Sequence, residues 1–346
     1  MDWLKNKISP PDQEFLQQAL LRQMQLTKPP GSLGVLEDIA VRLAAMQQTE
    51  FPDADRVWIT VFAADHGIAE ESVSAFPQSV TCEMLKNFAD GGAAISVLAN
   101  QVGAKLEVVN AGTCKEILVP EVIHSPVGAG TKNFLRQPAM TREQVEKALV
   151  VGKQAVARAL DDNAHLYIGG EMGISNTTSA SACASAILNI DAAALTGAGT
   201  GLNVDGIKKK EGIIRNAVRK HQQNLNSPVA VLQCLGGFEI AALTGAYLHA
   251  AQQKLPVIVD GFIATVASLI AEKIMPGVIE WFFYAHCSAE KGHRLVLQAL
   301  NVKPILDFNM RLGEGSGAAV AIPVIRLACT LHNRMATFEE ANISKE

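Results

Sequence analysis

Glu314 stands among glycines in a stretch whose other flanks are apolar, a setting in which a carboxylate can act as a base. Three glycines of the stretch 311–319 surround it, and residues without a Cβ leave backbone N–H groups and space open to a ligand. Apolar neighbours such as Leu312 raise the pKa of a carboxyl group, which makes it a usable base near neutral pH. The alternative is a solvated glutamate in a surface loop.

Glu171 is the second candidate, because it follows an apolar run directly and precedes a series of hydrogen-bonding side chains. Residues 169–173 read Gly-Gly-Glu-Met-Gly, and residues 175–178 read Ser-Asn-Thr-Thr. So many polar groups after a strand indicate a binding site, at which Met172 and Gly173 would also lie. The alternative is a residue in the first turn of a helix, where a carboxylate complements the helix dipole.

The glycine-rich stretch 197–202 could bind a phosphate. Gly199, Thr200 and Gly201 form its centre, and the main-chain N–H groups of such a loop can cradle one phosphate. The stretch matches neither GxGxxG nor GxxxxGK(S/T), so the ordinary nucleotide motifs are absent and a plain turn is the alternative. Lys210, the last of three consecutive lysines, could contact the same phosphate or belong to a solvated helix face.

Phe76 and Gln78 could form one wall of a pocket for an aromatic base, since they lie in the polar stretch that follows the first apolar run. The alternative is a loop that only covers the sheet edge. His66, His286 and His293 lack the HExxH spacing of a zinc site, and we expect them to be core histidines rather than ligands. The sequence therefore predicts no metal site.

These candidates follow apolar, β-branched runs, which indicates the elements that position them. Short apolar runs alternating with helical segments are typical of strands buried on both faces, and hence of a parallel α/β sheet flanked by helices. The six predicted strands are residues 56–64, 106–109, 165–168, 229–235, 257–259 and 278–284. Ligands bind at the carboxyl ends of such strands. We therefore expect Glu171 and Glu314 at one pocket, with the loop 199–201 on the order of 10 Å away at its far end.

Helical periodicity predicts the remaining elements. Between the strands, the predicted helices are residues 80–88, 93–101, 142–160, 179–188, 206–221, 239–253 and 264–274. Residues 11–25, 36–48 and 318–337 precede the first strand or follow the last, and their apolar residues recur at helical spacing. We expect residues 1–50 and 318–346 to form a small helical domain that packs against an α/β domain of residues 51–317.

Composition excludes several classes of function. The chain has 346 residues, 49% of them hydrophobic and 18% charged, with a formal net charge of −4. Without a basic field, nucleic acid is not expected as a partner. No run reaches the ~18–20 apolar residues that span a bilayer, and the N-terminus lacks a secretory signal. The six cysteines show no CxxC spacing, which indicates reduced core thiols, so we expect a cytoplasmic protein with no membrane contact.

The chain resembles the family of nicotinate-nucleotide–dimethylbenzimidazole phosphoribosyltransferases nearly from end to end. The resemblance depends on seven stretches in order, each of which alone is weak evidence. They are Lys28-Pro29-Pro30-Gly31-Ser32-Leu33-Gly34, Ala64-Asp65-His66-Gly67, residues 170–178, Gly199-Thr200-Gly201, Asp260-Gly261-Phe262, residues 288–293 and residues 311–319.

The resemblance implies a Rossmann-like sheet with a small helical domain, assembled as a homodimer, and we expect no cofactor. It implies that nicotinate mononucleotide and 5,6-dimethylbenzimidazole give α-ribazole 5′-phosphate and nicotinate, with inversion at C1′. Glu314 matches the family's catalytic glutamate and would take a proton from the attacking ring, while Glu171 would orient that ring or assist the base. The other substrate-binding candidates are Gly199, Lys210 and Gly261 for phosphate and ribose, Phe76, Gln78, Met172 and Leu312 for the base, and Gly173, Thr200, Gly201 and Gly313.

A missing motif bears on the donor. Transferases that use the pyrophosphate donor carry a strand ending in two adjacent acidic residues, which hold the ribose beside Mg²⁺. The strand 257–259 is followed by Asp260-Gly261, with a single acid, which argues against such a donor.

Two other classes of protein are alternatives. A non-catalytic nucleotide sensor needs no buried carboxylate beside its glycine loops, and a dinucleotide-dependent oxidoreductase is disfavoured by the absent GxGxxG.

Overall fold

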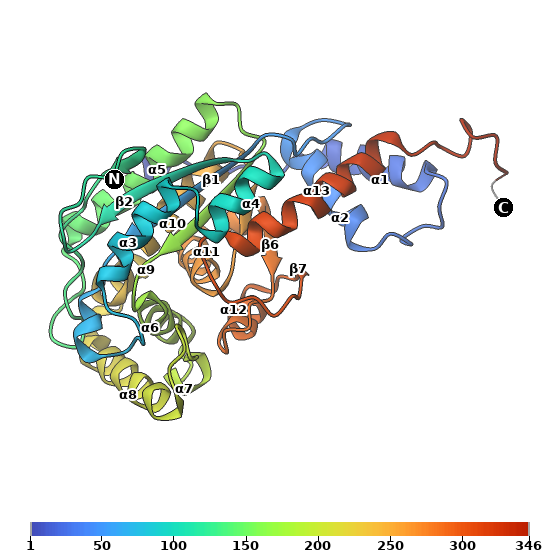
Figure 1. Ribbon diagram of the computed structural model, residues 1–346. Helices are drawn as coiled ribbons and strands as arrows, with labels where there is room; N and C mark the ends of the chain where they lie inside the picture. The colour runs from blue at the N-terminus through green and yellow to red at the C-terminus, as the bar shows by residue number, and fades with distance from the viewer. Residues whose placement is uncertain (1, 345–346) are drawn as a thin grey trace.

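A seven-stranded parallel sheet forms the centre of the molecule, which the computed structural model describes over residues 2–344 (Figure 1). The strand order is β3-β2-β1-β4-β5-β6-β7, and every neighbouring pair is parallel. The strands are β1 (Val57–Ala64), β2 (Lys105–Gly112), β3 (Val122–His124), β4 (Leu166–Met172), β5 (Val257–Val259), β6 (Phe282–His286) and β7 (Pro304–Leu306). The predicted parallel α/β class is confirmed.

The direction of winding reverses between β1 and β4, because the chain passes from β1 outward to β2 and β3 before it returns to β4. Phe62 of β1 pairs with Glu171 of β4, so Glu171 lies at this reversal point. Ligands of open α/β sheets bind where the strand order reverses, outside the carboxyl ends of the strands. The fold therefore puts Glu171 where a ligand site is expected.

One predicted strand is wrong and two strands were missed. The run 229–235 forms the helix α9 (Pro228–Leu235), which starts with Pro228 in its first turn and with the Ser227 side chain accepting from the N–H of Ala230. A short apolar run does not distinguish a strand from a buried helix. The run 278–284 begins as the 3₁₀ helix η4 (Val278–Trp281) before β6. β3 and β7 have three residues each, lie at the two sheet edges and are mostly half-buried, so neither has a long apolar run.

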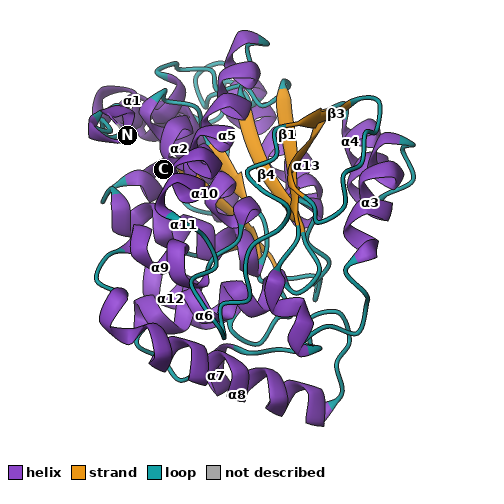
Figure 2. Ribbon diagram, turned by 90° about the vertical axis from the view of Figure 1, so that its left-hand side faces the viewer, coloured by secondary structure: helices purple, strands orange, loops and turns teal. Residues whose placement is uncertain are grey.

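The helices cover both faces of the sheet. Those of the chain interior are α3 (Ser79–Ala89), α4 (Ala94–Val102), α5 (Arg142–Asp161), α6 (Asn176–Leu188), α7 (Ala192–Leu195), α8 (Val204–His221), α10 (Phe238–Gln252), α11 (Phe262–Ile274) and α12 (His293–Leu300). The terminal helices are α1 (Gln13–Gln25), α2 (Val35–Gln47) and α13 (Ser316–Arg334), and the short 3₁₀ helices are η1 (Asp2–Lys5), η2 (Gly67–Glu71) and η3 (Gln222–Asn224). α5, α10 and α11 cover one face, whereas α3, α4 and α13 cover the other (Figure 2).

Glycine permits the close contact between α5 and α10. A Cβ on Gly152 of α5 would collide with the main chain of Ala242, and a Cβ on Gly245 of α10 would collide with the main chain of Leu149. The two helices therefore approach each other closely enough for backbone contact. This packing holds α10, which is buried along most of its length, against β1, β2 and β4.

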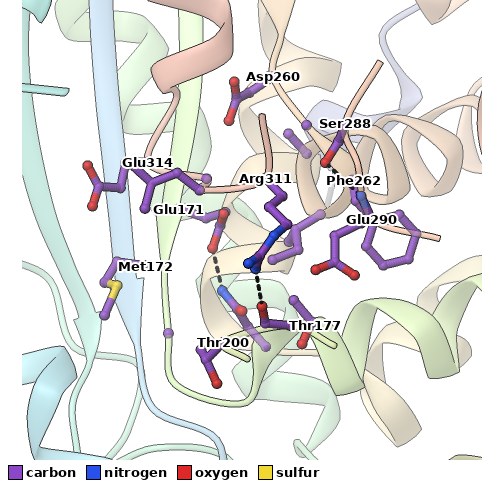
Figure 3. Close-up of a pocket in the computed structure, with 18 of the residues that line it drawn as sticks. Glu171, Met172, Thr177, Thr200, Asp260, Phe262, Ser288, Glu290, Arg311 and Glu314 are labelled. Carbon is purple, nitrogen blue, oxygen red and sulfur yellow. Dashed lines mark hydrogen bonds between the residues drawn. The ribbon is translucent and has the colours of Figure 1, made fainter. Parts of the chain in front are cut away.

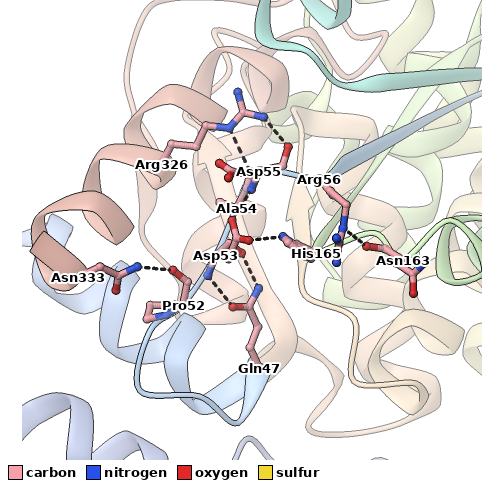
Figure 4. A network of polar contacts seen from close by, with 10 residues as sticks. All are labelled: Gln47, Pro52, Asp53, Ala54, Asp55, Arg56, Asn163, His165, Arg326 and Asn333. Atoms are coloured by element: carbon pink, nitrogen blue, oxygen red, sulfur yellow. Dashed lines mark hydrogen bonds and ion pairs between the residues drawn. The ribbon is translucent and has the colours of Figure 1, made fainter.

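The two ends of the chain meet beyond the sheet, where α1, α2 and the last turns of α13 lie side by side (Figure 1). Leu26 forms an antiparallel bridge with Thr337. The segment before β1 is held by α13, since Arg326 donates to the carbonyl oxygens of Ala54 and Asp55 and Asn333 donates to that of Pro52 (Figure 4). The start of α13 packs on β4 and β6. The division of the chain into a helical domain of residues 1–50 and 318–346 and an α/β domain of residues 51–317 stays a prediction.

Residues 2–344 bear on two expectations from the sequence, the absence of membrane-spanning helices and the burial of the cysteines. Within this range, no helix combines the length and the apolarity that crossing a membrane requires. All six cysteines are free thiols, of which Cys183, Cys234, Cys287 and Cys329 are buried, Cys82 is half-buried and Cys114 is exposed. The expectation of core thiols therefore holds for four of the six and is wrong for Cys114.

Candidate active site

A cavity of about 360 Å³ lies at the carboxyl edge of the sheet, next to the ends of β4, β5 and β6 (Figure 3). Its volume falls within the ~300–1,000 Å³ of typical small-molecule sites. The predicted site residues that line it are Phe76, Glu171, Met172, Gly173, Gly199, Thr200, Gly261, Leu312, Gly313 and Glu314. Gln78, Gly201 and Lys210 are not among the residues that line it. Segments from Phe76 to Glu314 thus converge on one cavity, as the parallel sheet requires.

Glu314 is buried in the cavity wall, with 6% of its surface exposed, which excludes the solvated surface loop. Its Oε2 accepts a hydrogen bond of 3.3 Å from the main-chain N–H of Ile95, in the first turn of α4. Burial raises the pKa of the Glu314 carboxyl group, the Ile95 N–H lowers it, and the nearby charge of Asp260 raises it further. The net shift is upward, in the direction that makes a carboxylate a stronger base.

Glu171 is the second-last residue of β4 and does not start a helix, since α6 begins only at Asn176. The Asn176 side chain donates a hydrogen bond to Oε2 of Glu171. Burial raises the pKa of Glu171 well above its ordinary value, and the charges of Glu239 and Asp260 act in the same direction, against the hydrogen bond from Asn176. The protonated form of Glu171 is therefore favoured at a pH where an exposed glutamate would be ionised.

The two glutamate segments are in main-chain contact, and glycines make this contact possible. The N–H of Glu314 donates to the carbonyl oxygen of Glu171 at 3.2 Å. A Cβ on Gly170 would collide with the main chain of Glu314, and a Cβ on Gly313 would collide with Oε1 of Glu171. Gly313 also has a φ of +93°, which L residues with side chains rarely adopt.

Hydrogen bonds join the predicted phosphate loop to two other segments beside the cavity, where Thr200 and Arg311 are among the lining residues (Figure 3). The Thr200 hydroxyl accepts from the N–H of Ala75 at 3.0 Å and lies 2.9 Å from Oγ of Ser74. Arg311 donates through Nη1 to the carbonyl oxygen of Gly199 at 2.9 Å. The loops after β1, after α7 and before α13 thus form one wall of the cavity.

Lys210 lies behind this wall and is buried, so the solvated helix face is wrong for this residue. Its Nζ donates to the Thr177 hydroxyl at 2.7 Å, and a Cβ on Gly199 would lie 3.3 Å from that nitrogen. Burial lowers the pKa of Lys210 to about 8, and the carboxylate of Glu290 opposes this shift. The site therefore has a cationic nitrogen directly behind the Gly199 backbone.

Gln78 and the three histidines considered as metal ligands each have a different set of neighbours. Gln78 donates to the carbonyl oxygen of His66 at 3.0 Å, and the buried imidazole of His66 lies 2.6 Å from Oε1 of Glu239. His286 lines the cavity, and Nε2 of His293 lies 2.9 Å from the Thr265 hydroxyl. Among residues 2–344, no group of three or more His, Cys, Asp or Glu side chains is arranged to hold a metal ion.

Several residues that line the cavity were not among the predicted catalytic or substrate-binding residues. They include Asn176, Thr177, Asp260, His286, Ser288, Glu290 and Arg311. Most follow β4, β5 or β6 within a few residues, so the rule that ligands bind at carboxyl strand ends would have indicated them. The main-chain N–H of Ile95 donates a hydrogen bond to Glu314. Nothing in the sequence indicated this role, because Ile95 is an apolar residue in the first turn of a helix packed on the sheet.

Comparison with known proteins identifies the class of enzyme. A family model described as phosphoribosyltransferase matches residues 8–343. The nicotinate-nucleotide–dimethylbenzimidazole phosphoribosyltransferase of Xanthomonas axonopodis pv. citri (strain 306) is 53% identical over 344 residues, which cover 99% of each chain. The chain therefore belongs to the family of nicotinate-nucleotide–dimethylbenzimidazole phosphoribosyltransferases, which are pentosyltransferase enzymes.

Other relatives agree with this assignment. The protein of the same name from Pseudomonas fluorescens (strain Pf-5) is 54% identical over 334 residues, covering 96% of this chain and 95% of its own. The crystal structure of the Thermus thermophilus nicotinate-nucleotide–dimethylbenzimidazole phosphoribosyltransferase superimposes with a TM-score of 0.92 at 40% identity, covering 97% of this chain and all of its own.

Proposed function

We propose that the protein transfers the phosphoribosyl group of nicotinate mononucleotide to 5,6-dimethylbenzimidazole, giving α-ribazole 5′-phosphate and nicotinate. The product is the nucleotide of the cobalamin lower ligand. The names of the relatives support this reaction. The single observation that carries the chemistry is the buried Glu314 carboxylate, whose raised pKa and cavity position suit a base.

In the proposed reaction, one benzimidazole nitrogen attacks C1′ of the ribose while nicotinate departs from the opposite face. The configuration at C1′ is thereby inverted, so a β-linked donor gives an α-linked product. The second ring nitrogen must lose its proton, and Glu314 takes it. Nicotinate leaves as a stable anion and needs little acid assistance, so positioning and charge stabilisation supply most of the rate.

Glu171 orients the attacking ring or assists Glu314 in this proposal. Because burial and neighbouring carboxylates raise the pKa of Glu171 well above its ordinary value, its protonated form can donate a hydrogen bond. Asn176 holds the other carboxyl oxygen, which leaves Oε1, beside Gly313, to face a ligand. Glu171 therefore suits a hydrogen-bonding role better than that of the principal base.

The remaining candidates divide between the two substrates. Phe76, Met172 and Leu312 line the cavity and are proposed to contact the base, with Gln78 supporting their loop through its hydrogen bond to His66. Gly199 and Gly261 are proposed to hold phosphate and ribose, and the remaining substrate-binding candidates are Gly173, Thr200, Gly201 and Gly313. Lys210 supplies positive charge to the phosphate from behind Gly199.

We also propose that the enzyme is a cytoplasmic homodimer with the helical domain of residues 1–50 and 318–346. The buried Glu314 favours an enzyme over a non-catalytic nucleotide sensor, which needs no such carboxylate beside its glycine loops.

The proposed reaction is tested by incubating the purified protein with nicotinate mononucleotide and dimethylbenzimidazole and separating the products by chromatography. Formation of α-ribazole 5′-phosphate with equimolar nicotinate is expected, and a folded protein that binds both substrates without forming product would contradict the proposal.

A further inference from the structure

Asp260 lies directly after β5 and lines the cavity, although the proposed reaction assigns it no role. Its side chain is buried and accepts two main-chain hydrogen bonds at the start of α13. The N–H of Ala318 donates to Oδ1 at 2.9 Å, and the N–H of Gly315 donates to Oδ2 at 3.2 Å. Gly315 is the next residue after Glu314, so Asp260 holds the segment that carries the proposed base.

The segment around Glu314 needs stabilising hydrogen bonds from elsewhere because its backbone conformation is unfavourable. Glu314 has a φ of 64°, between Gly313 at 93° and Gly315 at 84°. The left-handed region is unfavourable for a residue with a side chain, because its Cβ comes too close to the following carbonyl oxygen. α13 also begins without a side-chain cap from its own N-cap residue. Asp260 supplies acceptors for the free N–H groups of this helix start from another element of the fold.

The titratable groups near Asp260 come from several elements packed around it. Nε2 of His286 on β6 lies 3.7 Å from Oδ1, Glu171 and Glu314 share the cavity, and the ring of Tyr247 on α10 lies close enough for the Asp260 charge to raise its pKa. Burial raises the pKa of Asp260, while His286 and the main-chain N–H groups lower it. The Asp260 charge in turn raises the pKa of both Glu171 and Glu314.

We propose that Asp260 is a positioning residue for the reaction: it fixes the main chain on the carboxyl side of Glu314 and so keeps the Glu314 carboxylate at the first turn of α4. This inference rests on the proposed function, in which Glu314 is the base. Asp260 acts through Glu314 and not on the substrate. Removing its carboxylate should therefore slow turnover without weakening donor binding.

The first experiment measures Asp260→Asn. The amide keeps one accepting oxygen but turns an NH₂ group toward the other main-chain N–H, so one of the two hydrogen bonds is lost. A displacement of about 1 Å can reduce a rate about 100-fold, so kcat should fall roughly 10- to 100-fold while KM for nicotinate mononucleotide changes little. The acid limb of the kcat profile should move to lower pH, because removing a negative charge lowers the pKa of Glu314.

The matched control is Asp12→Asn. Asp12 accepts hydrogen bonds from two N–H groups at the start of α1, far from the cavity, so this variant should leave kcat unchanged.

The second experiment is a double-mutant cycle with Glu314→Gln, measured in single turnovers. If Asp260 acts through Glu314, Asp260→Asn should reduce the rate less than about twofold in the Glu314→Gln background. Equal fold-losses in both backgrounds, or a raised KM with unchanged kcat, would overturn the inference and leave the base intact. A fully active Glu314→Gln enzyme would instead contradict the base and the inference together. If Asp260→Asn does not fold, Asp260→Ser, which keeps a smaller uncharged acceptor, takes its place in the same cycle.

Discussion

The main-chain N–H of Glu314 donates to the main-chain carbonyl oxygen of Glu171 at 3.2 Å, which joins the two carboxyl-bearing segments of the cavity. The bond lies between the end of β4 and the segment before α13, which come from distant parts of the chain. This bond holds the two backbone segments together, and the hydrogen bonds from Ile95 to Glu314 and from Asn176 to Glu171 hold the two carboxyl groups before any ligand binds. Preorganisation of this kind is what a reaction driven mainly by positioning requires.

The first prediction concerns Glu314→Gln. Glutamine keeps the size and the hydrogen bond from Ile95 but is not basic. General-base catalysis contributes roughly 10²- to 10⁴-fold, so kcat should fall by about that factor, while KM for nicotinate mononucleotide changes little. Steady-state kinetics with product chromatography measures both constants. Near-normal turnover at neutral pH would exclude Glu314 as the base.

The second prediction concerns metal ions. Asp260 has both carboxylate oxygens engaged by main-chain N–H groups, and side chains within residues 2–344 form no ligand cluster. Activity should therefore survive exhaustive treatment with EDTA, measured as the initial rate before and after dialysis. A loss of rate that added Mg²⁺ or Zn²⁺ restores would contradict this expectation.

The third prediction concerns Lys210 and pH. Burial lowers the pKa of Lys210 to about 8, so the ammonium is present below that pH and is lost as the pH rises through it. A substrate phosphate with its second pKa near 6 is already a dianion there. The ratio kcat/KM for nicotinate mononucleotide should therefore fall above pH 8 or so.

Two variants separate this effect from a general loss of activity at high pH. Lys210→Met removes the positive charge behind Gly199 and the charge-assisted hydrogen bond to Thr177. It should lower kcat/KM roughly 10- to 100-fold and should remove the alkaline limb. Lys208→Met changes a lysine of the same helix that lies outside the cavity wall and should change neither. An alkaline limb that persists in Lys210→Met would show that another group titrates.

Much of this arrangement follows from the sequence, because strand ends and glycine-flanked carboxylates carry local signals. Glu171 and Glu314 could be identified as candidates, and the parallel sheet required them to meet. The run 229–235 was misassigned because a buried helix and a buried strand share the same apolar composition. The hydrogen bond from Ile95 to Glu314 could not be predicted, since it depends on how α4 and α13 pack together. The place of Lys210 behind Thr177 depends in the same way on the packing of α6 against α8.

The last prediction concerns Gly313→Ala. Gly313 has a φ of +93°, and a Cβ there would collide with Oε1 of Glu171. The positive φ should lower the free energy of unfolding by about 1–2 kcal/mol, and the collision should displace the Glu171 carboxyl group and reduce kcat.

Gly103→Ala is the matched control, because Gly103 has a φ of +64° at the end of α4 and open space where a Cβ would lie. It should lose a similar free energy of unfolding, measured by denaturant titration, yet keep its kcat. The contrast isolates the contact with Glu171 from the backbone strain, since both variants carry the strain and only one disturbs the carboxyl group. Equal kcat in the two variants would mean that the position of Glu171 next to Gly313 has no part in turnover.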